Sequence, residues 1–271
     1  MFRFISGNTN KCAITKANVY MNNNITPIIN YAVENNSKYD LVYYEYKNLL
    51  EMLPKNYLIA IKLSSFNYNV SNINDIVNVC IDKKINLVVD AETVSNNNKY
   101  QSYVNDIIFN PKIHDSIKIY KTYQMYRLDS LDQIQKDINR CNKLNIPFNA
   151  KLVRGAYWNT EYNTGELFID KHLTDKSYNN AILKVYNENL NGTPCNVILA
   201  THNTFSCEFG KSLNEKNIFE FAHLQGMREN YFKNMNEKVY VYIPYGPYHL
   251  MVPYMLRRLY ENLSMVKYMI I

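Results

Sequence analysis

The sequence predicts an α/β protein that folds as a (β/α)8 barrel of the TIM type, in one compact domain. Eight short apolar segments alternate with segments of helical periodicity, which is typical of a parallel sheet covered by helices. The length of 271 residues matches the usual size of such a barrel. A doubly wound open sheet is the alternative, but the chain has neither G-x-G-x-x-G nor a phosphate-binding loop motif to favour it.

The expected strands are short apolar runs, and they cover residues 25–33, 58–64, 85–90, 117–126, 148–153, 195–200, 218–224 and 239–243. Segment 58–64 is apolar on both faces, as expected of a parallel strand that is covered on both sides. In segment 148–153, Phe148, Ala150 and Leu152 alternate with the residues between them, which indicates a strand.

Helical periodicity predicts helices over residues 10–20, 41–53, 74–83, 100–109, 131–144, 178–190 and 247–262. In the second of these, Val42, Tyr46 and Leu49 fall on one side. Residues 174–178 offer side chains typical of a helix start, and Pro247 suits the first turn of the last helix.

The weakly patterned residues 1–24 are interpreted as a short N-terminal extension, and residues 25–271 as the barrel. No Pro- or Gly-rich linker separates two halves of the barrel segment.

Composition excludes several classes of function. The net charge of +6 is scattered without a basic block, which argues against a nucleic-acid partner. Five cysteines without CxxC spacing argue for reduced thiols and against a zinc or other metal site. No apolar run approaches the ~18–20 residues of an integral membrane span, and the first residues resemble neither a signal nor a transit peptide. A cytoplasmic protein is therefore expected, and its oligomeric state is not readable from the sequence.

Polar residues mark the carboxyl ends of the expected strands, where the active site of such a barrel lies. They are Lys62, Asp90, Gln124, Lys151, Arg154, Thr201, His202 and Tyr242. Within the octet 151–158 (KLVRGAYW), two cations flank the strand end, and a glycine follows where a ligand can approach the backbone. This arrangement suits a flat, partly anionic cofactor. The alternative is a plain strand end with snorkelling cations beside a packed Tyr-Trp pair.

The last expected helix carries Tyr254, Arg257, Arg258 and Glu261 at positions that share one face. Two adjacent arginines present fork-shaped donors that suit a carboxylate. The alternative is a solvated arginine pair that bridges to Glu261.

These motifs together resemble the proline dehydrogenase (proline oxidase) family. The similar segments are KLVRGAYW at 151–158, ATHN at 200–203, LQGM at 224–227, YIPYG at 242–246, PYMLRRLYEN at 253–262, and upstream TYQMY at 122–126, IKLS at 61–64, DAE at 90–92 and ITPIINYAVE at 25–34. The resemblance implies an FAD enzyme on a (β/α)8 barrel that oxidises L-proline to 1-pyrroline-5-carboxylate by hydride transfer from C5 to flavin N5.

The resemblance also implies roles for individual residues. Asp90 and Lys151 are expected to be catalytic, with Lys151 close to flavin N5. The expected substrate-binding residues are Lys62, Leu224, Tyr242, Tyr254, Arg257 and Arg258. The expected FAD-binding residues are Ala91, Gln124, Lys151, Arg154, Gly155, Ala156, Thr201 and His202.

Two other functions remain open on this reading. A hydroxyproline dehydrogenase is similar, but relatives with that preference tend to lose the tyrosine that matches Tyr242. A non-catalytic flavin- or ligand-binding barrel would be expected to lose at least one of Lys62, Arg257 and Arg258, and all three are present. The family implies a quinone as electron acceptor, and with it a peripheral membrane contact that no segment of this sequence identifies.

Overall fold

The computed structural model describes residues 4–33 and 39–252, and its eight strands form a closed barrel in the order β1-β2-β3-β4-β5-β6-β7-β8. The strands are β1 (Thr26–Tyr31), β2 (Leu58–Ile61), β3 (Asn86–Val89), β4 (Ile119–Gln124), β5 (Phe148–Val153), β6 (Cys195–Ala200), β7 (Phe219–Leu224) and β8 (Val239–Tyr245). The predicted (β/α)8 fold is confirmed, and each predicted strand has its counterpart. β2 and β3 end just before Lys62 and Asp90, so these two charged residues follow their strands directly.

The α-helices are α1 (Asn10–Met21), α2 (Tyr39–Met52), α3 (Val70–Lys83), α4 (Asn97–Ile108), α5 (Pro111–His114), α6 (Ser130–Leu144), α7 (Trp158–Glu161), α8 (Lys171–Leu190), α9 (Thr204–Ser212) and α10 (Glu229–Lys233). Short 3-10 turns lie at η2 (Leu63–Phe66), η3 (Val94–Asn96) and η4 (Tyr162–Thr164). A last helix begins after Pro247 and is described only to residue 252, so the rest of the predicted 247–262 helix lies outside the described residues.

The predicted start of one helix was wrong, and the sequence did not predict α5, α7, α9 or α10. α8 begins at Lys171 rather than at residues 174–178, because the Asp170 side chain caps it by accepting the His172 N–H at 2.8 Å. α9 was not predicted, since a glycine interrupts its short periodic pattern. A Cβ on that glycine, Gly210, would lie 2.4 Å from Leu199 Cδ1, so close packing explains the residue.

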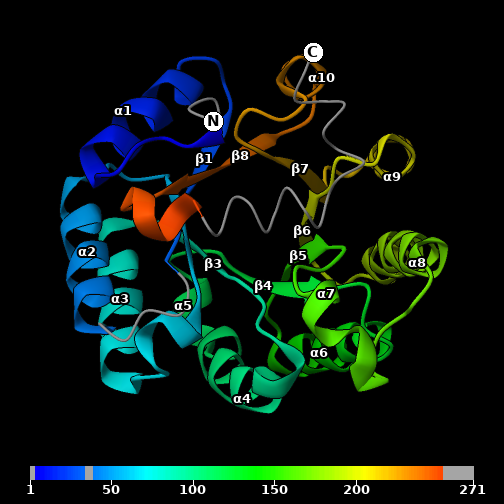
Figure 1. Ribbon diagram of the computed structural model, residues 1–271. Helices are drawn as coiled ribbons and strands as arrows, with labels where there is room; N and C mark the ends of the chain where they lie inside the picture. The colour runs from blue at the N-terminus through cyan, green and yellow to red at the C-terminus, as the bar shows by residue number, and fades with distance from the viewer. Residues whose placement is uncertain (1–3, 34–38, 253–271) are drawn as a thin grey trace. The chain divides into compact units, whose positions relative to one another are not determined.

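The chain divides into two compact units, residues 1–90 with 222–271, and residues 91–221. In the first unit, β1 pairs in parallel with both β2 and β8, and β2 pairs with β3. α1 packs on β1 and β8 and buries Ala13, Ala17 and Tyr20 (Figure 1). The segment predicted to be an extension thus includes a packed helix, and a domain boundary near residue 24 stays a prediction.

In the second unit, β5 pairs in parallel with β4 and β6, and every residue of β4 is buried. The buried residues of β4 include a cation, Lys121. Its Nζ lies 2.6 Å from the Asp137 carboxylate on α6. Burial lowers the pKa of Lys121, although Asp137 acts against that effect. A buried charge of this kind is tolerated because it is paired.

Candidate active site

In the second unit, the predicted cofactor residues lie at the carboxyl ends of β4, β5 and β6 or directly after β3. Gln124 is the last residue of β4, Lys151 lies in β5, and Thr201 follows β6. Lys151 and Thr201 are each 6% exposed, and Gln124 is 3% exposed. The others are Ala91, Arg154, Gly155, Ala156 and His202, which lie in the loops after β3, β5 and β6.

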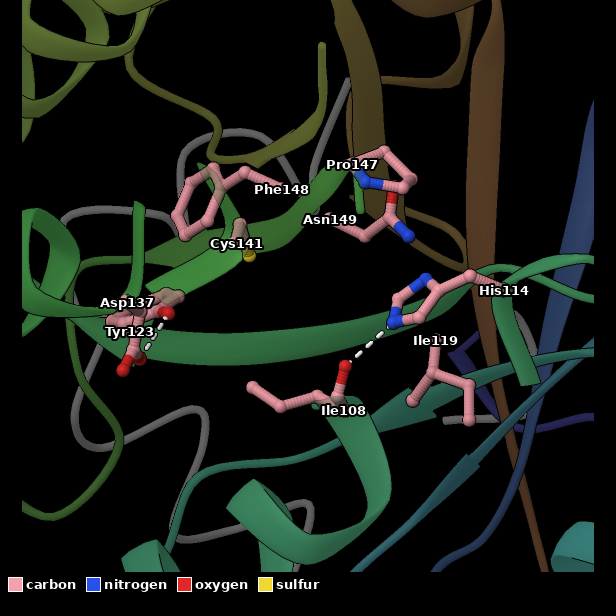
Figure 2. A pocket seen from close by; sticks show the side chains of 9 residues that line it. All are labelled: Ile108, His114, Ile119, Tyr123, Asp137, Cys141, Pro147, Phe148 and Asn149. Atoms are coloured by element: carbon pink, nitrogen blue, oxygen red, sulfur yellow. Dashed lines mark hydrogen bonds between the residues drawn. The ribbon is translucent and has the colours of Figure 1, made fainter. Parts of the chain in front are cut away.

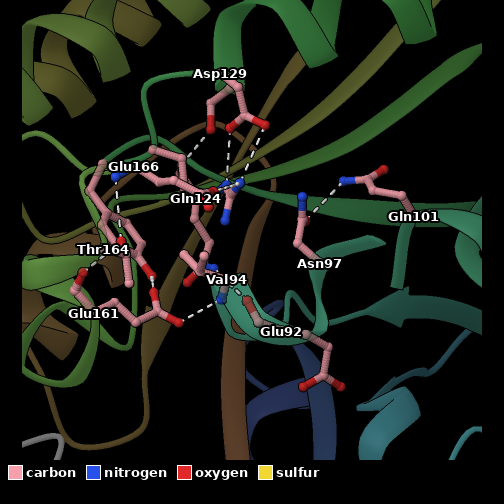
Figure 3. A network of polar contacts seen from close by, with 12 residues as sticks. Glu92, Val94, Asn97, Gln101, Gln124, Asp129, Glu161, Thr164 and Glu166 are labelled. Carbon is pink, nitrogen blue, oxygen red and sulfur yellow. Dashed lines mark hydrogen bonds and ion pairs between the residues drawn. The ribbon is translucent and has the colours of Figure 1, made fainter. Parts of the chain in front are cut away.

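The Gln124 side chain joins two of these loops (Figure 3). Its Nε2 donates to the Glu92 carbonyl at 2.9 Å, and its Oε1 accepts the Ala156 N–H at 3.0 Å. One amide thereby fixes the backbone next to Ala91 and the backbone at Ala156. The second Nε2 hydrogen is not needed for these two bonds.

Arg154 is held by three side chains. Its Nε donates to Asp175 Oδ1 at 2.5 Å, one terminal nitrogen donates to Thr201 Oγ1, and the other donates to Ser206 Oγ at 3.0 Å. Its guanidinium also lies over the Tyr178 ring, 4.6 Å from the centroid. The sequence-predicted pair of Arg154 and Thr201 is therefore in direct contact.

Asp175 on α8 completes this arrangement. Burial raises the pKa of its carboxyl, but hydrogen bonds from Lys171 and Arg154 outweigh burial, and the net pKa is lowered. A carboxylate is thus available to orient the guanidinium. The sequence reasoning placed Asp175 at a helix start and missed this role.

Gly155 has a φ of +144°, which favours glycine, and a Cβ there would lie 1.6 Å from Tyr126 Cδ1. The glycine is required because the Tyr126 ring occupies the space that a Cβ would need. The sequence reasoning assigned this glycine to ligand approach. Its contact with Tyr126 is an additional reason for the residue.

In the first unit, the Tyr242 hydroxyl donates to Asp90 Oδ2 at 2.6 Å. Both side chains were predicted site residues, and each residue is 7% exposed. A neighbouring phenol, Tyr46, is influenced by both Asp90 and Lys62. Burial raises the pKa of Tyr46, the negative charge of Asp90 raises it further, and the positive charge of Lys62 lowers it. Leu224, the last residue of β7, is half-buried.

Three predicted substrate residues, Tyr254, Arg257 and Arg258, lie outside the described residues. Their roles stay predictions.

A small cavity lies away from the predicted site residues, at the amino-terminal ends of β4 and β5 (Figure 2). His114, Asp137 and Asn149 line it together with Ile108, Ile119, Tyr123, Cys141, Pro147 and Phe148. It has room for about one water molecule. A cavity of this size at the amino ends of strands is not a substrate site.

Among residues 4–33 and 39–252, no helix is long and apolar enough to cross a membrane. In the same residues, no cluster of three or more His, Cys, Asp or Glu side chains could hold a metal ion.

A closed parallel barrel with helices between its strands places the chain in the class of (β/α)8-barrel proteins. The family model described as proline dehydrogenase matches residues 10–269. The chain belongs to the proline dehydrogenase family, whose members are FAD-dependent oxidoreductases of proline catabolism.

Curated relatives support this membership. The chain is 32% identical to proline dehydrogenase 2, mitochondrial, of Arabidopsis thaliana over 69% of this chain and 43% of that protein. It is 26% identical to proline dehydrogenase 1, mitochondrial, of Dictyostelium discoideum over 92% of this chain and 47% of that protein. It is 27% identical to hydroxyproline dehydrogenase of Bos taurus over 73% of this chain and 47% of that protein. The chain thus spans less than half the length of these relatives.

Solved structures support the fold. Proline utilization A from Bdellovibrio bacteriovorus, inactivated by N-propargylglycine, superposes with a TM-score of 0.86 at 18% identity. The match covers 96% of this chain and 32% of that one.

Proposed function

We propose that this chain catalyses the FAD-dependent oxidation of L-proline to 1-pyrroline-5-carboxylate, with a quinone as the final electron acceptor. The observation that carries the proposal is the contact between Tyr242 and Asp90, two residues expected at the substrate from the family motifs and hydrogen-bonded at 2.6 Å. Family membership supports the reaction class.

The residues expected at the cofactor have the chemistry that FAD requires. Gln124 offers amide hydrogens to ring carbonyl and nitrogen atoms, and Lys151, Arg154 and His202 offer cationic or imidazole donors to anionic groups. Bound FAD would supply the hydride-accepting centre. Lys151 would stabilise negative charge there by its own fixed positive charge.

The chain's own residues would bind and orient proline. Lys62, with Arg257 and Arg258, would hold the substrate carboxylate, because cations paired with a desolvated carboxylate fix its position. Asp90 fixes the Tyr242 phenol by accepting its hydrogen bond. The ring of Tyr242, with Leu224 and Tyr254, would then form the apolar wall around the pyrrolidine and exclude water.

A hydroxyproline dehydrogenase is the second candidate, because bovine and murine relatives carry that name. The presence of Tyr242 supports proline, since its phenol would occupy the space that a 4-hydroxyl needs.

We also propose a cytoplasmic location, from the sequence alone; the Arabidopsis and Dictyostelium relatives are named mitochondrial. Fractionation of cells that express the native gene would test the location.

The proposed reaction is tested by product formation. Purified protein, loaded with FAD and given L-proline and a soluble quinone, should form 1-pyrroline-5-carboxylate detectable by mass spectrometry. The same assay with trans-4-hydroxy-L-proline should give a much smaller rate. A higher rate with hydroxyproline would support the second candidate instead.

A further inference from the structure

Glu161, the last residue of α7, is 4% exposed and has two short hydrogen bonds. Its Oε1 accepts the backbone N–H of Val94 at 2.6 Å, and its Oε2 accepts the Tyr126 hydroxyl at 2.6 Å. These partners are 67 and 35 residues away in the chain. One buried carboxylate therefore ties α7 to the loop after β3 and to the end of β4.

Both partners adjoin residues expected to touch FAD. Val94 lies just after Ala91 in the loop that Gln124 also fixes through the Glu92 carbonyl (Figure 3). The Tyr126 ring lies against Gly155. The backbone N–H of Tyr126 donates to the Arg154 carbonyl at 2.8 Å. Glu161 thus acts on the loop after β3 and on the loop after β5.

The chemistry of the Tyr126 contact favours a fixed hydrogen bond. Burial raises the pKa of the Tyr126 phenol, and the bond to Glu161 raises it further, so the hydroxyl remains a donor across the physiological pH range. A charged acceptor makes such a bond roughly twice as strong as a neutral one.

We propose that Glu161 is a positioning residue that holds the Ala91 loop and the Arg154–Ala156 loop in the arrangement that binds FAD. This rests on the proposed function. Glu161 would touch neither substrate nor cofactor, and it would act through Tyr126 and Val94. The octet 151–158 ends at Trp158, the first residue of α7, and Glu161 is the last residue of that helix.

Glu161→Gln tests the proposal, because it keeps the side-chain shape and removes the charge. Tyr126→Phe keeps the ring against Gly155 and removes the hydroxyl. Glu166→Gln is the matched control, since Glu166 also accepts a hydrogen bond, from Arg127 at 3.0 Å, but its side chain is 52% exposed.

Each apoprotein is titrated with FAD by flavin fluorescence, the absorption spectrum of the bound flavin is recorded, and urea unfolding is measured in parallel. Glu161→Gln should weaken FAD binding about 10-fold and shift the bound-flavin absorption bands, because a charged hydrogen bond is lost. Tyr126→Phe should have a smaller effect in the same direction. The double variant should bind FAD no more weakly than Glu161→Gln alone, because the two groups form one unit. Glu166→Gln should match the wild type.

Wild-type affinity and an unshifted flavin spectrum in Glu161→Gln would overturn the proposal. Should that variant not fold, Tyr126→Phe decides in its place: affinity and spectrum equal to the wild type would overturn it. A wild-type apoprotein that takes up no FAD would overturn the proposed function, and this inference with it.

Discussion

At the scale of single residues, we propose that the Tyr242 side chain sets the choice between proline and 4-hydroxyproline. Its hydroxyl is engaged by Asp90, so the ring is fixed and cannot easily turn away from a larger substrate. Tyr242→Ser should lower kcat/KM for L-proline and raise it for 4-hydroxyproline. The ratio of the two values should change by about 10-fold or more, as for other single-group differences in a pocket.

Tyr242→Phe is the control for this prediction. It keeps the bulk of the ring and loses only the bond to Asp90, so the preference for proline should fall much less than in Tyr242→Ser. An unchanged ratio in Tyr242→Ser would show that the ring does not line the part of the pocket near ring carbon 4.

The Asp175 carboxylate makes a contribution to the free energy of unfolding that depends on pH. Its folded-state pKa is lowered, so the stabilisation is present above the unfolded pKa of about 3.8 and is lost as the pH falls through the folded pKa. Asp175→Asn should therefore lower the free energy of unfolding at pH 7 by about 1–2 kcal/mol. The loss should be smaller once the pH has fallen through the folded-state pKa, which lies below 3.8, because the wild type then also loses the charge.

Urea unfolding at pH 7 and at the lowest pH that keeps the wild type folded measures this difference. An equal loss at both pH values would contradict the assigned role of the carboxylate.

At the scale of elements, the loop after β5 depends on Gly155. Gly155→Ala should destabilise the protein by about 2–4 kcal/mol, because an alanine meets both the strained φ and the Tyr126 ring. Gly165→Ala is the matched control, since its φ is also positive at +74° but no atom lies within 4 Å of the added Cβ. Thermal unfolding of both variants separates backbone strain from the clash, and equal losses would refute the packing role.

Several elements could be predicted because their signals are local. Parallel strands have continuous apolar runs, and the carboxyl ends of such strands meet at one edge, so Lys62, Asp90 and Gln124 could be assigned to strand ends. Helix starts were less readable. Asp170 and Asn203 cap α8 and α9, but the chain is so rich in asparagine that a capping side chain cannot be told from a loop residue.

The contacts within the site could not be predicted. Glu161 reaches partners 35 and 67 residues away, and no local pattern distinguishes it from a solvated glutamate on a short helix. The same holds for Asp175 and Ser206, which hold Arg154 through side chains far apart in the sequence.

At the scale of the whole molecule, two independent sequence signals predicted the fold and the family of this chain. The alternation of strands and helices predicted the closed parallel barrel, and the motifs along the chain predicted the family. The contacts among described residues add what the motifs lack, namely the partners that hold Gln124, Arg154 and Tyr242 in place.

The central claim is that this chain oxidises proline with a bound flavin. Its most direct test is the absorption spectrum of the FAD-loaded protein, recorded anaerobically before and after L-proline is added. We expect the oxidised flavin bands to bleach with proline and to return when a quinone is added. Bands that persist with proline but bleach with dithionite would show that the flavin is bound without accepting electrons from this substrate, and would contradict the claim.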